Sequence, residues 1–264
     1  MGILSQFIRS LPLYLLTMPV MLMALSIHES AHGYAAYKLG DPTAHNLGRI
    51  TLNPVKHFDL FGFLSMLIFH IGWAKPVPIF TRNFRNPRRD MAITGAAGPL
   101  SNLALAILHL LILRIVMFCI PEPIIKEAAE CFMALATGEA YVGSLGFTVL
   151  AIIVFLLYMG VVLNVMLAIF NLIPIPPFDG SRIFYAFLPP KLYFGVMKYE
   201  RYIMIAFIFL FFLSYNLHVN PLSYVENWIT QGLFTITGMG GKTDTGLVMN
   251  ILCIYTQNLL LIPF

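Results

Sequence analysis

The sequence Ile27-His28-Glu29-Ser30-Ala31-His32-Gly33 lies inside an apolar segment that runs from about residue 11 to residue 39. Residues four apart share one face of a helix, so His28 and His32 can hold one metal ion from consecutive turns. Glu29 lies beside them, near enough to take a proton from a water molecule on that metal. Charged groups are rare in membrane segments unless they serve a function. The stretch therefore predicts a helix that carries a metal site at membrane depth.

The composition of the whole chain is that of a membrane protein. Apolar residues make up 59% of its 264 residues and charged residues only 11%, whereas soluble domains are about one quarter charged. This length suits a single domain, residues 1–264, with about five or six membrane segments of roughly 20 residues each. The formal net charge of +4 does not indicate nucleic-acid binding, because Lys and Arg in a membrane protein set its topology. We expect an all-α polytopic membrane protein.

Apolar stretches predict where the helices lie. The expected spans are residues 11–39, 91–120, 141–172 and 202–217, with a last span or interfacial segment at 247–263. Residues 60–71 are apolar but too few to cross a bilayer, so a re-entrant or membrane-inserted hairpin that closes at Pro78 is expected there. Residues 50–52 alternate as in a strand, residues 121–140 suit an amphipathic loop or short helix, and residues 181–200 are expected to form a basic loop.

Basic residues are distributed unevenly along the chain. Of its 16 Lys and Arg residues, eight lie in the region 38–89 and four in the region 182–201. The positive-inside rule places both regions in the cytoplasm. His32 then lies in the cytoplasmic half of the first helix, and Asp179 lies just past the cytoplasmic end of the third. We expect a multi-pass protein of the cell (plasma or inner) membrane, with its active site towards the cytoplasmic side.

A catalytic zinc ion needs three protein ligands and an open position, and the helical motif supplies two. Lys38 occupies the position six residues after His32, which excludes the metzincin pattern. No glutamate follows Glu29 before residue 122, which is expected on the opposite side of the membrane. Four aspartates remain as oxygen ligands on the expected side: Asp41, Asp59, Asp90 and Asp179. The first three lie in polar loops, where turn capping is a sufficient explanation, whereas the last follows a proline-broken apolar stretch.

Two motifs resemble those of the site-2 protease family, the intramembrane zinc metalloproteases. One is His28-Glu29-Ser30-Ala31-His32. The other is Asn171-Leu172-Ile173-Pro174-Ile175-Pro176-Pro177-Phe178-Asp179-Gly180, which is similar to the family's Asn-x-x-Pro…Asp-Gly signature. Residues 53–62 and 95–102 also resemble the compact bacterial branch, which lacks PDZ and nucleotide-sensing domains. The resemblance covers about residues 11–190, and C-terminal helices are expected over about 198–264.

The resemblance implies a zinc metalloendopeptidase that hydrolyses peptide bonds in or near transmembrane segments. It implies a three-helix catalytic core in which zinc is bound by His28, His32 and Asp179. It also implies Glu29 as the general base on zinc-activated water. The expected partners are membrane-protein substrates with single-span helices and the lipid bilayer.

Two further polar residues are candidates for substrate binding. Asn171 is expected to hold an unwound substrate backbone through its amide, although a helix-capping role explains an asparagine there equally well. His57 is expected to supply a positive or hydrogen-bonding group near the site, with an ordinary loop histidine as the alternative. The segment from Leu60 to Pro78 is proposed to offer an edge or gate for the extended substrate, by strand addition.

Two other functions are compatible with these residues. In a non-enzymatic metal or proton transporter, His28, Glu29 and Asp179 would form a cation pathway. Transporters often show repeated halves, and no internal repeat is visible here. A zinc-binding pseudoprotease is the other alternative, and the intact Glu29 argues against it.

Overall fold

The computed structural model describes residues 3–62, 74–137 and 144–216, together with four positions between 228 and 235. All regular elements within these ranges are helices, which confirms the predicted all-α class. The strand expected at residues 50–52 is wrong, because these residues form bends. The physical reason is that the Ser30 hydroxyl donates to the Thr51 carbonyl at 2.6 Å and accepts from the Thr51 N–H at 3.1 Å. The backbone of this segment therefore bonds to the preceding helix instead of to a strand.

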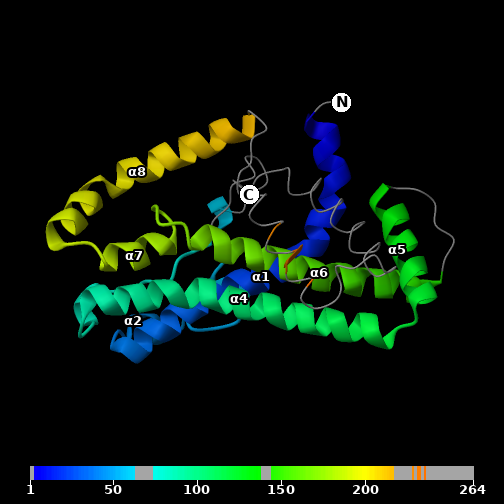
Figure 1. Ribbon diagram of the computed structural model, residues 1–264, viewed down its shortest axis with the longest axis horizontal. Coiled ribbons are helices and arrows are strands. Elements are labelled where there is room, and N and C mark those ends of the chain that lie inside the picture. Colours follow the sequence, from blue (N-terminus) through cyan, green and yellow to red (C-terminus); the bar gives the residue numbers. More distant parts are fainter. Residues whose placement is uncertain are drawn as a thin grey trace. The chain divides into compact units, whose positions relative to one another are not determined.

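Long helices account for most of the described residues (Figure 1). They are α1 (Ile3–Leu39), α4 (Pro87–Cys119), α5 (Glu122–Thr137), α6 (Leu145–Asn171) and α8 (Pro190–Asn216). Two of the described helices, α4 and α6, are long and apolar enough to cross a membrane, and they match the second and third predicted spans. The segment at 121–140, predicted as a loop or short helix, is largely the helix α5. Residues 63–73, which make up most of the expected hairpin, and the expected last span at 247–263 lie outside the described residues.

The basic loop expected at residues 181–200 is wrong. Helix α7 (Asp179–Ala186) begins there, and α8 begins at Pro190, earlier than the expected boundary at 198. Proline suits the first turn of a helix because its missing N–H would have no partner there. Arg182 of α7 and Glu200 of α8 form an ion pair at 2.7 Å. Charge density alone therefore gave a poor indication of loop structure in this region.

The first helix ends where the breaker residues predict. Gly40, directly after α1, has φ of +111°, a backbone conformation that favours glycine. The next residue, Asp41, is fully buried, and its carboxylate accepts hydrogen bonds from Thr43, from the Phe80 N–H at 2.7 Å and from the Asn83 amide at 2.7 Å. Burial raises the pKa of Asp41, but these hydrogen bonds outweigh burial and hold the pKa below its ordinary value. They also join the loop after α1 to the segment that precedes α4.

Residue contacts divide the chain into two compact units. One comprises Leu22–Ala104 and Asn164–Glu226, and the other comprises Met1–Met21, Leu105–Leu163 and Asn227–Phe264. All residues of the predicted site belong to the first unit, and the following sections concern that unit. The assignment of the whole chain to a single domain stays a prediction.

Candidate metal centre

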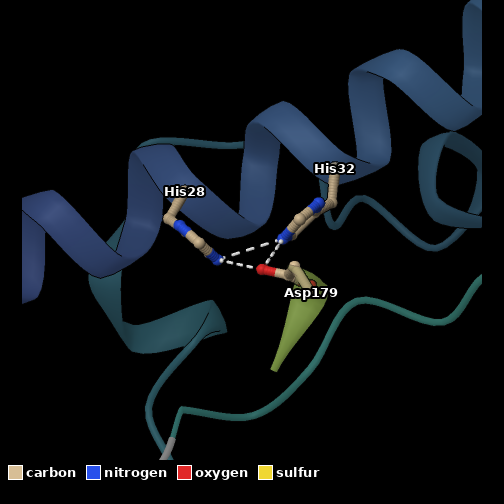
Figure 2. Close-up of side chains that lie close together, drawn as sticks. All are labelled: His28, His32 and Asp179. Carbon is tan, nitrogen blue, oxygen red and sulfur yellow. Dashed lines mark hydrogen bonds and ion pairs between the residues drawn. The ribbon is translucent and has the colours of Figure 1, made fainter. Parts of the chain in front are cut away.

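Three side chains converge between α1 and the start of α7 (Figure 2). His28 and His32 lie one turn apart on α1, and their Nε2 atoms are 3.0 Å apart. Asp179 is the first residue of α7, and its Oδ2 lies 3.1 Å from each of these nitrogens. Among the described residues, these three form a group whose donor atoms could hold a metal ion. The structure thus brings together two histidines and an aspartate that are about 150 residues apart in sequence.

The turn before α7 delivers Asp179 to this place. Residues 172–178 form turns and bends with a cis bond between Pro176 and Pro177, and Phe178 directly before α7 is extended. The chain folds back closely on itself here. A Cβ at Gly180 would lie less than 3.0 Å from backbone atoms of Leu172 and Ile173. Glycine after the aspartate is therefore required by the close approach of the backbone.

Helix α4 leaves room for the imidazole rings. A Cβ at Gly98 would lie less than 3.0 Å from ring atoms of both His28 and His32. One turn earlier, a Cβ at Gly95 would lie 3.2 Å from the Asp179 carbonyl oxygen. Small residues let helix backbones approach closely, and here the approach occurs against the three candidate ligands.

Hydrogen bonds on the far side of each ring set its orientation. His32 Nδ1 lies 2.7 Å from the Thr94 carbonyl oxygen. A carbonyl oxygen can only accept, so Nδ1 carries the proton and Nε2 presents a lone pair to Asp179. His28 Nδ1 is hydrogen-bonded to Asn102 Oδ1, which gives the second ring the same orientation.

The three converging atoms fit a divalent cation. A carboxyl group, with an ordinary pKa of about 3.9, is an anion at neutral pH, so Asp179 presents a negatively charged oxygen to the two imidazoles. Two lone pairs and a carboxylate oxygen at 3.0–3.1 Å repel one another unless a positive charge lies among them. Tetrahedral zinc, with bonds of about 2.0–2.2 Å, separates its ligands by about 3.3 Å. Two histidines with one carboxylate are a ligand set that catalytic zinc sites use.

The other aspartates that the sequence leaves open have different partners. Asp59 accepts from the Gly62 N–H at 2.7 Å, and Asp90 accepts from the Asn86 N–H at 2.9 Å. Together with the buried Asp41, these carboxylates organise loops and helix ends, as turn capping predicts. Asp179 is the one of the four that reaches the histidines.

The proposed base, Glu29, is half-buried on α1. Its Oε2 accepts a hydrogen bond from the Val77 N–H at 2.9 Å. Val77 belongs to residues 74–80, whose backbone has no regular secondary structure. Arg49 donates to the carbonyl oxygens of Lys75 and Pro76 at 2.7 and 3.2 Å. The carboxylate of Glu29 is therefore anchored to a segment that a buried arginine holds in place.

The backbone of residues 74–80 limits how a substrate strand could be added there. The N–H of Lys75 donates to the His57 carbonyl at 2.8 Å, and the N–H of Val77 is used by Glu29. Pro76 and Pro78 have no N–H. Between residues 75 and 78, each backbone N–H is therefore already used, and a substrate strand could bond there without displacing them only through backbone carbonyl oxygens.

The two residues predicted to bind substrate have local partners. His57 is buried, its Nε2 lies 3.0 Å from the Thr51 carbonyl oxygen, and its Nδ1 has no hydrogen-bond partner among the described residues. Asn171 donates to the Leu167 carbonyl of its own helix at 2.9 Å. These contacts do not join either residue to the three candidate ligands, and their substrate roles stay predictions.

Two asparagines at the centre were missed by sequence reasoning. Asn102 and Asn164 are both fully buried, and they lie in the apolar helices α4 and α6. The available signal was a polar amide in a membrane segment, which is costly unless it has a partner or a function. Residues 95–102 contributed only to the family resemblance, and no role was predicted for Asn102.

Comparison with known proteins gives one family and several relatives. The sequence model of peptidase family M50 matches residues 16–214. YwhC of Bacillus subtilis, named as a candidate zinc metalloprotease, is 35% identical over 208 residues, which are 79% of this chain and 82% of YwhC. Rip2 of Mycolicibacterium smegmatis, with the same description, is 30% identical over 183 residues, which are 68% of this chain and 58% of that protein. No solved structure matches the chain.

Proposed function

Because the chain belongs to peptidase family M50, we propose that it is an intramembrane zinc metalloendopeptidase that cleaves membrane proteins in or near their transmembrane segments. The family confirms the resemblance to site-2 proteases, and the relatives support a metallopeptidase with zinc as cofactor. The observation that carries the proposal is the convergence of three acceptor atoms from His28, His32 and Asp179 at 3.0–3.1 Å.

In the proposed mechanism, the two imidazoles and the carboxylate of Asp179 hold zinc. The bound ion supplies a Lewis acid that polarises a peptide carbonyl and activates water. Glu29 anchors one carboxylate oxygen on the Val77 N–H at 2.9 Å, and its other oxygen, Oε1, takes the proton of the attacking water. Glu29 then passes that proton to the leaving amine. The Val77 N–H orients the carboxylate for both transfers.

The membrane setting defines the proposed substrates. The apolar helices α4 and α6 indicate a membrane protein, and the distribution of basic residues favours a multi-pass protein of the cell membrane with its site towards the cytoplasm. A helical substrate must unwind first, because its carbonyls are engaged in backbone hydrogen bonds. Asn171 and His57 are proposed to bind the unwound stretch.

The test compares variants of the detergent-purified protein with candidate single-span substrates. Glu29→Gln should retain zinc and lose about 10²–10⁴-fold in cleavage rate, the range of a general base. Asp179→Asn should lower bound zinc, whereas the control Asp59→Asn, which alters a loop carboxylate bonded to Gly62, should not. Unchanged cleavage by Glu29→Gln would rule out the proposed mechanism. Loss of zinc from that variant would make Glu29 a ligand instead of a base.

A further inference from the structure

We propose that Asn164 and Asn102 form an amide relay that fixes the tautomer of His28 and so prepares its Nε2 for the metal ion. The proposal rests on the zinc site of the proposed function and assigns positioning roles to two residues outside the ligand set. The relay joins three residues of the same compact unit: His28 lies on α1, Asn102 on α4 and Asn164 on α6.

The direction of each hydrogen bond follows from one fixed acceptor. Asn102 Nδ2 lies 3.4 Å from the carbonyl oxygen of Ala24 and 2.9 Å from Asn164 Oδ1. A backbone carbonyl can only accept, so the amide nitrogen of Asn102 faces Ala24 and Asn164, and its oxygen must face His28. That oxygen accepts the Nδ1 proton of His28. The lone pair of His28 is then on Nε2, which faces Asp179.

Asn164 is a polar residue within the apolar helix α6, and it accepts a hydrogen bond from Asn102. It is fully buried in α6, between Leu163 and Val165. A buried amide in such surroundings costs stability unless it is hydrogen-bonded. Its Oδ1 gives the Asn102 amide group a second acceptor, and this holds Asn102 against rotation about its side chain. A rotated Asn102 would present N–H groups to His28 and would favour the tautomer whose lone pair points away from Asp179.

The outer contacts of a metal-binding histidine typically contribute 10–100-fold to metal affinity. We therefore expect Asn102→Leu to weaken zinc binding by about 10–100-fold, and Asn164→Leu to weaken it by about tenfold, the lower end of that range. Asn164→Asp keeps an acceptor oxygen at the same place and should retain most of the affinity. Ser26→Ala is the matched control, because Ser26 is also fully buried and, within the described part of the chain, bonds to the Leu22 carbonyl of its own helix alone.

A second pair of variants separates the relay from general damage to packing. Asn102→Asp still accepts the proton of His28, but it no longer donates to Asn164. In the Asn102→Asp protein, adding Asn164→Leu should leave zinc affinity unchanged or raise it, because two acceptor oxygens would otherwise face each other. A merely structural role of Asn164 predicts the same loss in both backgrounds.

Zinc affinity is measured by competition with a chromophoric chelator on the full-length protein in detergent, without any substrate. The relay would be overturned if Asn164→Leu bound zinc as tightly as the original protein. It would also be overturned if Asn164→Leu lowered zinc affinity by the same factor in the Asn102→Asp protein as in the original protein. If Asn164→Leu does not fold, Asn164→Ala removes the same acceptor without adding volume, and unchanged affinity in that variant has the same meaning. Absence of zinc binding by the original protein would instead overturn the proposed function itself.

Discussion

A single methyl group added to α4 tests the packing of the metal centre. In Gly98→Ala, the new Cβ would lie less than 3.0 Å from His32 Nε2, His32 Cε1 and His28 Cε1, whereas ordinary contacts lie at 3.4–4 Å. The added carbon therefore meets one of the candidate ligand atoms directly. The helix or the rings must move by about 0.6–1 Å for these contacts to become ordinary, which is more than the ±0.2 Å within which metal–ligand distances normally fall.

The size of the effect follows from the cost of overpacking, which is about 1–3 kcal/mol. If the strain falls on the metal-binding conformation, zinc affinity should fall by roughly 5- to 140-fold, because 1.4 kcal/mol corresponds to a factor of ten. The assay is the chelator competition described above, together with the melting temperature in detergent.

The control is Gly195→Ala on α8, where an added Cβ has no neighbour within 4 Å among the residues that the structure describes. That variant should bind zinc normally and should not melt earlier, since alanine is the better helix former by about 1 kcal/mol. The reasoning is refuted if Gly98→Ala binds zinc as tightly as the original protein. A lower melting temperature with normal zinc affinity would also refute it, because the strain would then lie away from the histidines.

Two further predictions concern charge and metal. The pKa of Asp41 in the folded protein is lowered from the ordinary aspartate value of about 3.9. Ionised Asp41 therefore stabilises the folded protein at pH values above about 3.9. This stabilisation is lost as the pH falls through the pKa of the folded protein. Asp41→Asn should therefore melt earlier at neutral pH and show a weaker dependence of melting temperature on pH below about 4; equal slopes would contradict this. Removing metal with EDTA should lower the melting temperature, because the three acceptor atoms then face one another uncompensated. Zinc at 100 times its Kd should restore about 2.7 kcal/mol, and Asp179→Asn should show little of this shift.

Local patterns predicted most of the helices and half of the site. The spacing of His28 and His32 needs only helical geometry to place both on one face, and α1 ends at Leu39 because Gly40 follows it. Apolar stretches of more than 20 residues predicted α4 and α6, because a run of apolar residues can be recognised within one helix without knowing what the helix packs against. The prediction for residues 50–52 failed because the partner of the Thr51 backbone is the distant Ser30. The prediction for residues 181–200 failed because basic residues were taken as a sign of a loop, whereas α7 and α8 occupy most of that stretch.

The sequence by itself determined that this protein has apolar helices, a paired-histidine motif on one of them and a short list of aspartates that could complete it. The family resemblance already implied Asp179 as the third ligand, and the tertiary structure added that its Oδ2 lies 3.1 Å from both histidines. That proximity depends on how the chain folds back between Leu172 and Gly180. The tertiary structure also revealed the anchoring of Glu29 by Val77. Contacts of this kind join residues far apart in the chain, and no local period or spacing encodes them. The candidate metal centre therefore depends on packing between helices, and one of these helices already carries the paired-histidine motif.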